Sequence, residues 1–360
     1  MKYVTLKDVC TINMGQSPDS DSYNDNGEGV PFFQGNADFG ERYPVTRKWC
    51  SAPTKMAAPE DILISVRAPI GAMNYAKEEC CIGRGLAALT PDKTKVSPKF
   101  IFWLLKGKNA ELNSKGTGST FKAIGRKVLE ETKVPDISLE KQLEHSETLE
   151  KIYAVIQHRK SELQMLDDLI KARFVEMFNL SDCIYKSLGE CTDFVDYRGH
   201  TPELSDEGII RMVNAKSVGK GFFKYVDEFV TEETYDAWMH RGFGYPGDIL
   251  FVTEGHTFGN TCLIPEDMTK FALGQRVITI KGKEEIKNAF LCSYMQTDMF
   301  WKDINVYRTG GTAQGIRSKD LVKVMVPIPP IEQQIEFVRF VHKVDKSKVA
   351  VQKALDETQL

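Results

Sequence analysis

The sequence predicts an α+β protein: two similar mixed α/β domains separated by two long helices that pack as an antiparallel coiled coil. The junction VPDISLEKQ, which begins at Val134, returns as VPIPPIEQQ, which begins at Val326. Similar segments precede both junctions in the same order, and a long run with helical periodicity follows each one. Because self-similarity along a chain indicates repeated structural units, we predict two copies of one domain, each followed by its own helix.

Length and composition are typical of a multidomain globular protein. A chain of 360 residues exceeds the usual size of one hydrophobic core, so at least two domains are expected. Hydrophobic residues make up 42% and charged residues 27%, and no run of about 18 uncharged apolar residues could span a membrane. The first residues lack the basic-then-apolar pattern of a secretion signal. We expect a cytoplasmic protein with no membrane partner, whose eight cysteines are reduced, mostly buried thiols rather than zinc ligands.

Net charge alone does not indicate a nucleic-acid partner. The formal charge is −3, yet residues 1–137 contain 19 Lys and Arg against 16 Asp and Glu. A polyanion would therefore have to meet local basic patches rather than a uniformly basic surface. A neutral protein with scattered surface charge agrees equally well with these counts.

The repeat extends over whole domains. Segments upstream of the two junctions match in order, with an offset that drifts as a few loop insertions would make it drift. The matched pairs are 3–9 with 185–191, 15–18 with 199–202, 59–63 with 246–250, 82–84 with 273–276, and 118–120 with 310–312. We place the two domains at 1–137 and 181–329, and the two long helices at 138–180 and 330–360.

Each domain is predicted to be rich in short strands. Short apolar runs with β-branched residues predict strands. They lie at 61–66, 85–90 and 133–137 in the first copy, and at 248–253, 276–281 and 324–328 in the second. Apolar residues at three- and four-residue steps predict short helices at 97–107 and 287–300.

The runs after the junctions predict two long helices that pair with each other. Their apolar residues alternate between three- and four-residue steps: Leu149, Ile152, Ile156, Leu163, Leu166, Ile170 and Met177 in the first, and Phe337, Val341, Val344, Val351 and Leu355 in the second, with Lys348 in one slot. Such a narrow seam is typical of a coiled coil. The alternative is two exposed connector helices, each packed on its own domain.

Several motifs in a fixed order resemble one protein family. They are PEDIL at 59–63, PGDIL at 246–250, IGRGLAAL at 82–89, GTGSTFKAI at 116–124, GGTAQGIRS at 310–318 and the two junctions. Together they resemble the specificity subunit of Type I DNA restriction-modification systems, over essentially the whole chain. The first junction, PDISLEKQ, departs from the PPIEQQ pattern of the second.

The resemblance implies a function and a set of partners. In that family each of two target recognition domains reads one half of a split sequence in double-stranded DNA. The paired helices space the domains and dock methyltransferase subunits, two of them in our prediction, and restriction subunits join the same complex. The resemblance implies a recognition subunit that is not an enzyme and has no cofactor of its own.

Polar residues in matched loops are the candidate DNA contacts. Arg, Lys, Asn and Gln read base edges, while hydroxyls and backbone amides hold phosphates. In the first domain the candidates are Gln16, Gln34, Asn36, Arg67, Arg84, Thr117, Ser119 and Lys122. In the second they are His200, Asn214, Lys216, His256, Thr257, Arg276, Thr309, Thr312 and Gln314. Each one alone has an ordinary explanation as a solvated side chain or a turn residue, but their matching places in both halves favour a shared function.

The sequence contains no recognisable catalytic motif. A methyltransferase that flips a base needs residues to hold that base, and PIPPIE has the prolines of such a motif without an Asn or Asp before them or an aromatic residue after them. No GxSxG or HExxH segment occurs either. We therefore predict no catalytic and no metal site. Two alternatives remain open: a coiled-coil scaffold whose domains bind protein, and a self-contained modification enzyme.

Overall fold

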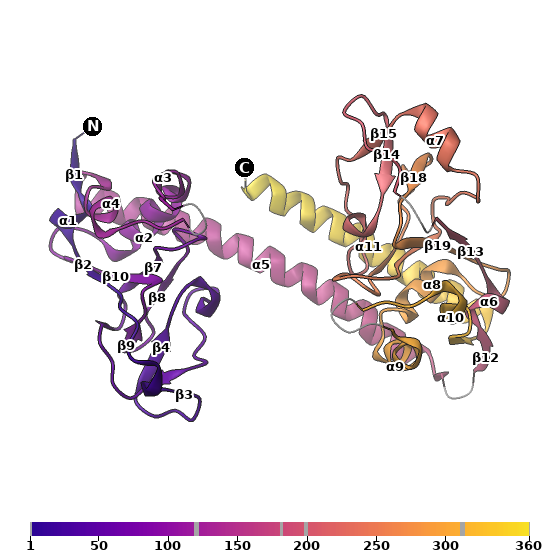
Figure 1. Ribbon diagram of the computed structural model, residues 1–360, viewed down its shortest axis with the longest axis horizontal. Helices are drawn as coiled ribbons and strands as arrows, with labels where there is room; N and C mark the ends of the chain where they lie inside the picture. The colour runs from indigo at the N-terminus through magenta and orange to yellow at the C-terminus, as the bar shows by residue number, and fades with distance from the viewer. Residues whose placement is uncertain (1, 119–121, 181–182, 198–200, 310–313, 360) are drawn as a thin grey trace. The chain divides into compact units, whose positions relative to one another are not determined.

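The computed structural model describes residues 2–118, 122–180, 183–197, 201–309 and 314–359, and it divides into two compact units. The first is Met1–Ile156 and the second is Gln157–Leu360. The division falls inside a long helix, α5, which runs Leu139–Met177 (Figure 1). Each unit has its own hydrophobic core. Among the residues described, no helix is both long and apolar enough to cross a lipid bilayer.

The first unit combines small sheets with short helices. Its strands are β1 (Tyr3–Thr5), β2 (Cys10–Met14), β3 (Tyr23–Asn24), β4 (Val30–Phe33), β5 (Trp49–Cys50), β6 (Met56–Ala57), β7 (Ile62–Ser65), β8 (Met73–Tyr75), β9 (Cys80–Ile82), β10 (Leu86–Pro91) and β11 (Lys133–Pro135). Its short helices are α1 (Leu6–Val9), α2 (Pro98–Gly107), α3 (Asn109–Ser114) and α4 (Arg126–Glu130). The described strands form the sheets β1-β11, β2-β10-β7-β8 and β3-β5-β4-β9-β6.

The second unit is built from the same kinds of element (Figure 1). Its strands are β12 (Ile184–Ser187), β13 (Thr192–Asp196), β14 (Ile210–Val213), β15 (Phe229–Val230), β16 (Ile249–Val252), β17 (Thr261–Leu263), β18 (Phe271–Leu273), β19 (Val277–Gly282) and β20 (Met325–Ile328). Its helices are α6 (Leu188–Cys191), α7 (Glu232–Trp238), α8 (Asn288–Tyr294), α9 (Asp298–Tyr307), α10 (Ser318–Leu321) and α11 (Ile331–Gln359). The sheets are β12-β20, β13-β19-β16-β17 and β15-β14-β18.

The two units share one topology, as the repeat predicts. The antiparallel order β13-β19-β16-β17 repeats β2-β10-β7-β8, and the parallel pair β14–β18 repeats β4–β9. The strands predicted at 61–66, 85–90, 248–253 and 276–281 are β7, β10, β16 and β19. The single helix predicted at 287–300 is wrong: the segment forms α8 and begins α9, because the Thr297 side chain accepts a hydrogen bond from the Phe300 N–H and starts a new helix.

A buried aspartate explains why the PxDIL segment occurs in both copies. The Asp61 carboxylate accepts a hydrogen bond from the Ala58 N–H at 2.8 Å, and Asp248 accepts one from the Tyr245 N–H at 3.0 Å. The residue before each aspartate has positive φ, 68° at Glu60 and 83° in the other copy, where glycine occupies the position. The aspartate closes the turn that starts β7 or β16 and satisfies a backbone donor that would otherwise lack a partner.

In the second unit, the last part of α5 packs against the start of α11. The ring of Phe174, from α5, and the ring of Phe178, which follows the end of α5, each lie 5.5 Å from the ring of Phe337, from α11. All three side chains belong to the core of this unit, and Phe337 is fully buried. Aromatic edge-to-face contacts of this kind add to the free energy of burial. The two helix segments are therefore joined through the core of the second domain.

Covered positions on α11 follow the predicted seam. They recur in steps of four and three, at Phe337, Val341, Val344, Lys348, Val351 and Leu355. Lys348 fills the polar slot, and its ammonium lies 2.6 Å from the Asp167 carboxylate of α5. The Arg173 guanidinium of α5 lies 3.4 Å from the Glu336 carboxylate of α11. Because later residues of α5 meet earlier residues of α11, the two segments run antiparallel.

Candidate nucleic-acid interface

In the first unit, loops from different parts of the chain converge on the turn between β9 and β10, which contains Arg84. Three backbone hydrogen bonds fix them there: Gln16 N–H to the Ile82 carbonyl at 3.0 Å, Gly83 N–H to the Phe33 carbonyl at 2.8 Å, and Val66 N–H to the Gly85 carbonyl at 2.9 Å. The last two bonds hold the residues immediately before Gln34 and Arg67. Three loops and one turn thus meet at one end of the sheet β2-β10-β7-β8.

A fourth loop completes this cluster. The Ala68 N–H donates to the Lys122 carbonyl at 3.0 Å, and Arg67 and Thr117 each form a backbone bridge with Ala123. The side chains of Gln16, Gln34, Arg67, Arg84, Thr117 and Lys122 are all exposed, while Asn36 is half-buried. We call these seven residues the first loop cluster.

The first loop cluster presents unpaired cations. Among the described residues, no carboxylate forms an ion pair with Arg67, Arg84 or Lys122. Exposed guanidinium and ammonium groups next to amide side chains can hold phosphates and read base edges. This end of the sheet is therefore suited to a polyanionic ligand.

The same arrangement recurs in the second unit. The equivalent hydrogen bonds are Gly274 N–H to the Val213 carbonyl at 2.8 Å, Thr253 N–H to the Arg276 carbonyl at 2.8 Å, and Gly255 N–H to the Gln314 carbonyl at 2.9 Å. Glu254 and Thr309 each form a backbone bridge with Gly315. The structure therefore brings together Asn214, Lys216, His256, Thr257, Arg276, Thr309 and Gln314, which we call the second loop cluster.

The matching hydrogen bonds identify which positions correspond, and two pairings differ from simple sequence matching. Arg276 occupies the place of Gly85, because their carbonyls accept equivalent bonds. The counterpart of Arg84 is therefore Gln275, which is not among the predicted contact residues. The counterpart of Arg67 is Glu254, since both bridge to the equivalent loop.

These two differences change the charge of the second loop cluster. The Arg276 guanidinium forms an ion pair with the Glu254 carboxylate at an N–O distance of 2.9 Å. Arg276 also has a φ of 70°, which L-residues rarely adopt. Strained backbone of this kind persists where surrounding structure holds it, often at functional sites. The first unit has no acidic residue at the position of Glu254, so the two clusters differ in charge.

Besides Arg276, two residues of the second loop cluster, Asn214 and Lys216, are already engaged within the protein. The Asn214 side-chain amide donates to the Glu228 carboxylate at 2.6 Å, and the Lys216 ammonium pairs with the same carboxylate. The hydrogen bond from Lys216 lowers the pKa of Glu228 below its ordinary value. A ligand that used Asn214 or Lys216 would have to compete with Glu228.

Three predicted contact residues lie outside the described part of the chain. They are Ser119, His200 and Thr312. In the sequence, Ser119 lies between Thr117 and Lys122 of the first cluster, and Thr312 lies between Thr309 and Gln314 of the second.

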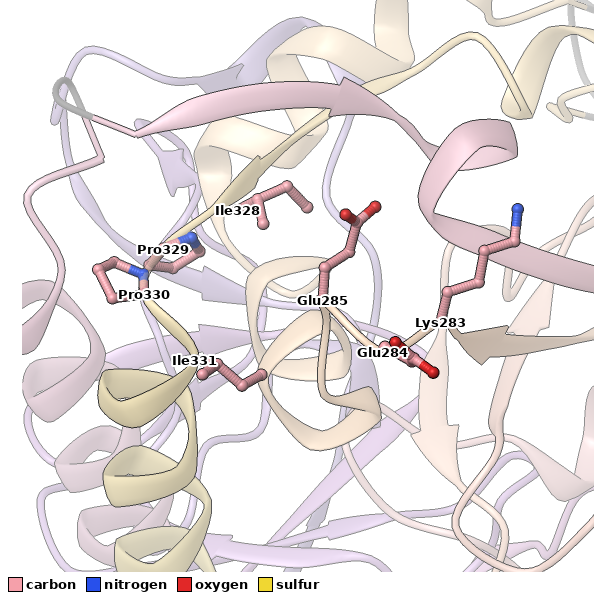
Figure 2. A pocket seen from close by; sticks show the side chains of 7 residues that line it. All are labelled: Lys283, Glu284, Glu285, Ile328, Pro329, Pro330 and Ile331. Carbon is pink, nitrogen blue, oxygen red and sulfur yellow. The ribbon is translucent and has the colours of Figure 1, made fainter.

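A separate hollow of about 800 Å³ lies where β20 turns into α11 (Figure 2). It is lined by Lys283, Glu284, Glu285, Ile328, Pro329, Pro330 and Ile331. The Glu285 carboxylate pairs with the Lys186 ammonium, and proline and isoleucine side chains form the opposite wall. This lining does not pair a nucleophile with a base, and the described residues contain no cluster of three or more metal-ligating side chains.

Most of the cysteines are buried. All eight are free thiols, and all except the half-buried Cys183 are buried. Burial raises the pKa to about 12 for Cys10, Cys80 and Cys292. Because the thiolate is the nucleophilic form, such thiols are poor nucleophiles near neutral pH. The prediction of mostly buried, unpaired cysteines is confirmed.

Comparisons with known proteins place both units in one family. The family model for the Type I restriction modification DNA specificity domain matches residues 1–165 and 193–358. A putative type I restriction enzyme MjaX specificity subunit from Methanocaldococcus jannaschii is 44% identical over 156 residues, which are 43% of this chain and 37% of that relative. The match therefore covers little more than a third of the relative's length.

Two solved structures are similar to parts or all of this chain. An HsdS subunit from Thermoanaerobacter tengcongensis is 47% identical, covering 42% of this chain and 36% of that one, with a TM-score of 0.39. A Type-I restriction-modification system S subunit from M. genitalium is 16% identical, covering 99% of this chain and 92% of that one, with a TM-score of 0.57, and so shares the fold. Since the family model matches most of the sequence in two successive segments, the chain belongs to the Type I restriction modification DNA specificity domain family.

Proposed function

We propose that this chain is the DNA-recognition subunit of a Type I restriction-modification complex. In this proposal the domain at 1–137 reads one half of a split DNA sequence and the domain at 181–329 reads the other half. The helices at 138–180 and 330–360 form an antiparallel coiled coil that sets the gap between the halves. The family match and the names of the relatives support this assignment.

The observation that carries the proposal is the duplicated loop cluster. Both units gather exposed polar loops at the same end of the same sheet, and both use equivalent backbone hydrogen bonds to do so. A loop cluster that served only to close a fold would not need cations and amide side chains in both copies. Two similar recognition domains in one chain are expected when the DNA target consists of two separated half-sites.

Linking the two readers increases both affinity and specificity. Once one domain has bound its half-site, the second meets its own at a high effective concentration, provided that the gap fits. The antiparallel contacts between α5 and α11 support a paired spacer. A site with the right words at the wrong spacing would gain little from the second domain.

We further propose that catalysis belongs to partner subunits. Two methyltransferase subunits would dock on the helices, and restriction subunits would join through the complex, in the cytoplasm. The chain itself would contribute neither a cofactor nor a reacting group. The support is that a relative is named a specificity subunit and that the site residues suit binding rather than chemistry.

The experiment is to map methylated positions genome-wide in cells that contain this chain and in cells that lack it. We expect a split motif, two short fixed words around a fixed gap, that is methylated only in the presence of the chain. Methylation of a contiguous motif, or of the same sites in both strains, would contradict the proposal.

A binding assay separates this function from a protein-binding scaffold. DNA binding by the purified chain should weaken steeply as salt rises, because counterions are released when cations meet phosphates. A scaffold would show no such binding. Methyl transfer by the isolated chain would instead indicate a self-contained enzyme.

A further inference from the structure

Gln142 joins the first turns of α5 to the first domain. Its side chain is only 3% exposed. Its carbonyl oxygen accepts a hydrogen bond from the Ser97 N–H at 2.9 Å. Its amide nitrogen donates to the Ile137 carbonyl at 2.9 Å and to the Lys95 carbonyl at 3.5 Å. One side chain therefore connects the long helix, the segment just before that helix, and the segment that leads into α2.

Gln334 repeats this arrangement at the start of α11. It is fully buried, and its carbonyl oxygen accepts a hydrogen bond from the Lys287 N–H at 2.8 Å. Its amide nitrogen donates to the Pro329 carbonyl at 2.8 Å and to the Glu285 carbonyl at 3.0 Å. The two segments that it connects line the hollow in Figure 2, with Glu285 on one side and Pro329 on the other.

The two glutamines match bond for bond. Ser97 and Lys287 are the residues that precede α2 and α8, and each donates its N–H to the glutamine. The two carbonyl acceptors occupy corresponding places in both copies as well. We call each set of three hydrogen bonds a glutamine bridge. The bridge recurs although the two junctions differ in sequence, PDISLEKQ against PIPPIEQQ.

A glutamine bridge constrains the direction of the helix axis more tightly than apolar packing does. Hydrogen bonds need close distances and near-linear geometry, whereas apolar contacts such as those of Phe337 tolerate small rotations. Three such bonds on one buried side chain fix the start of the helix against two backbone segments of its domain. A few degrees of tilt at the start of a long helix become a displacement of several ångströms at its far end, by simple geometry.

We propose that Gln142 and Gln334 are positioning residues that set the direction in which each long helix leaves its domain, and so select the gap length in the DNA site. This inference rests on the proposed function, because it concerns the spacing of two half-sites. It assigns a role in DNA recognition to residues that touch no DNA. Without the bridge, each domain would read its own half-site but tolerate several gaps.

The test uses Gln142→Met and Gln334→Met in the full chain. Methionine keeps nearly the length and volume of glutamine, so packing is retained while the hydrogen bonds are lost. Gln333→Met is the matched control, since Gln333 precedes Gln334 on the same helix and is exposed. The probes are duplexes that contain both half-sites selected by the unaltered chain, with the gap changed one base pair at a time, and a duplex with a single half-site.

The unaltered chain and the control should lose about tenfold or more in affinity when the gap changes by one base pair. In either bridge variant this loss should shrink to about threefold or less, while affinity for the single half-site stays within about twofold. A fold defect would instead lower affinity for every probe in parallel, and a melting curve of each variant detects it. If one variant does not fold, the other variant, in the other domain, decides.

Two results would overturn the inference in distinguishable ways. An unchanged gap preference in a folded bridge variant would refute the positioning role and leave the proposed function intact. Failure of the unaltered chain to select any gapped site would refute the proposed function and the inference together.

Discussion

At the scale of single residues, the two loop clusters differ in charge more than in shape. The first presents Arg67, Arg84 and Lys122 without ion-pair partners among the described residues. In the second, the equivalent region pairs Arg276 with Glu254. If both clusters bind DNA, the first should supply more of the salt-dependent affinity, since that term scales with the number of phosphates neutralised.

Replacing Arg84 should weaken DNA binding. We expect Arg84→Ala to lower affinity by about tenfold and, if the guanidinium meets a phosphate, to reduce the salt slope by about one. Fluorescence anisotropy with a labelled duplex at several salt concentrations measures both quantities. Lys93→Ala is the control, because Lys93 is exposed and follows the other end of β10. An equal loss of DNA affinity in both variants would mean that Arg84 does not contact DNA more closely than an ordinary surface lysine.

Neutralising Glu254 should have the opposite effect. Glu254→Gln removes the carboxylate that pairs with Arg276, so the guanidinium becomes available to DNA. We expect affinity to rise, by up to about tenfold, and the salt slope to grow by about one. The same titration measures this change. Weaker binding would indicate that Glu254 orients Arg276 or contacts DNA itself.

The sequence predicted most of the loop residues but not their exact correspondence. Glycine, serine and threonine residues predicted the turns, and polar residues between apolar runs predicted the tips of the loops. Side chains such as Glu254 and Gln275 could not be assigned to the site, because only the hydrogen bonds between distant loops show which residue stands beside which. Likewise, nothing in MVNAKSVG indicates that Glu228 engages Asn214 and Lys216.

At the scale of elements, the aromatic cluster joins two helices to one core. Phe337 of α11 contacts Phe174 of α5 and Phe178 just after it, and the ring of Phe290 in α8 stacks on Phe174 with centroids 5.6 Å apart. A residue at the centre of such a cluster contributes both burial and contact with several partners.

Truncating that residue should strongly destabilise the second unit. We expect Phe337→Ala to lower the free energy of unfolding by about 3–5 kcal/mol, because it leaves a cavity among rings that cannot collapse fully. Chemical denaturation followed by circular dichroism measures this loss. Val349→Ala, on the exposed face of the same helix, should change stability by less than about 0.5 kcal/mol. A small effect at Phe337 would mean that the helix is held by its other contacts.

Local apolar spacing in the sequence predicted the helices and strands that bury one regular face. It did not predict the very short elements. Periodicity located α5, α11 and the central strands, since their apolar spacing is set by their own geometry. The very short strands β3, β5 and β6 and the helix α7 were not predicted, because two to seven residues contain too little periodicity to recognise. Their positions depend on neighbouring strands rather than on their own sequence.

At the scale of the whole molecule, α5 has the proposed role of setting the distance between the two half-sites in DNA. Four residues inserted between Ile156 and Gln157 would lengthen the helix by ~6 Å and rotate its far end by about 40°. One base pair of DNA corresponds to roughly 3.4 Å and about 35°. The rotation of the helix end therefore favours a gap that is longer by about one base pair. The lengthening of the helix favours a gap that is longer by nearly two base pairs.

The duplication itself could be predicted from the sequence, because similar segments recur in the same order in both halves. The separation of the proposed half-sites could not be predicted, since it depends on the direction of each long helix and on its length. No single sequence motif determines the small differences in the angle at which each helix leaves its domain.

The most direct measurement compares the DNA sites selected from a random duplex library by the unaltered chain and by the chain with four residues inserted after Ile156. The account predicts that both select the same two words, and that the insertion lengthens the gap between them by one or two base pairs. An unchanged gap, or altered words at an unchanged gap, would show that the helices do not set the spacing between two independent readers.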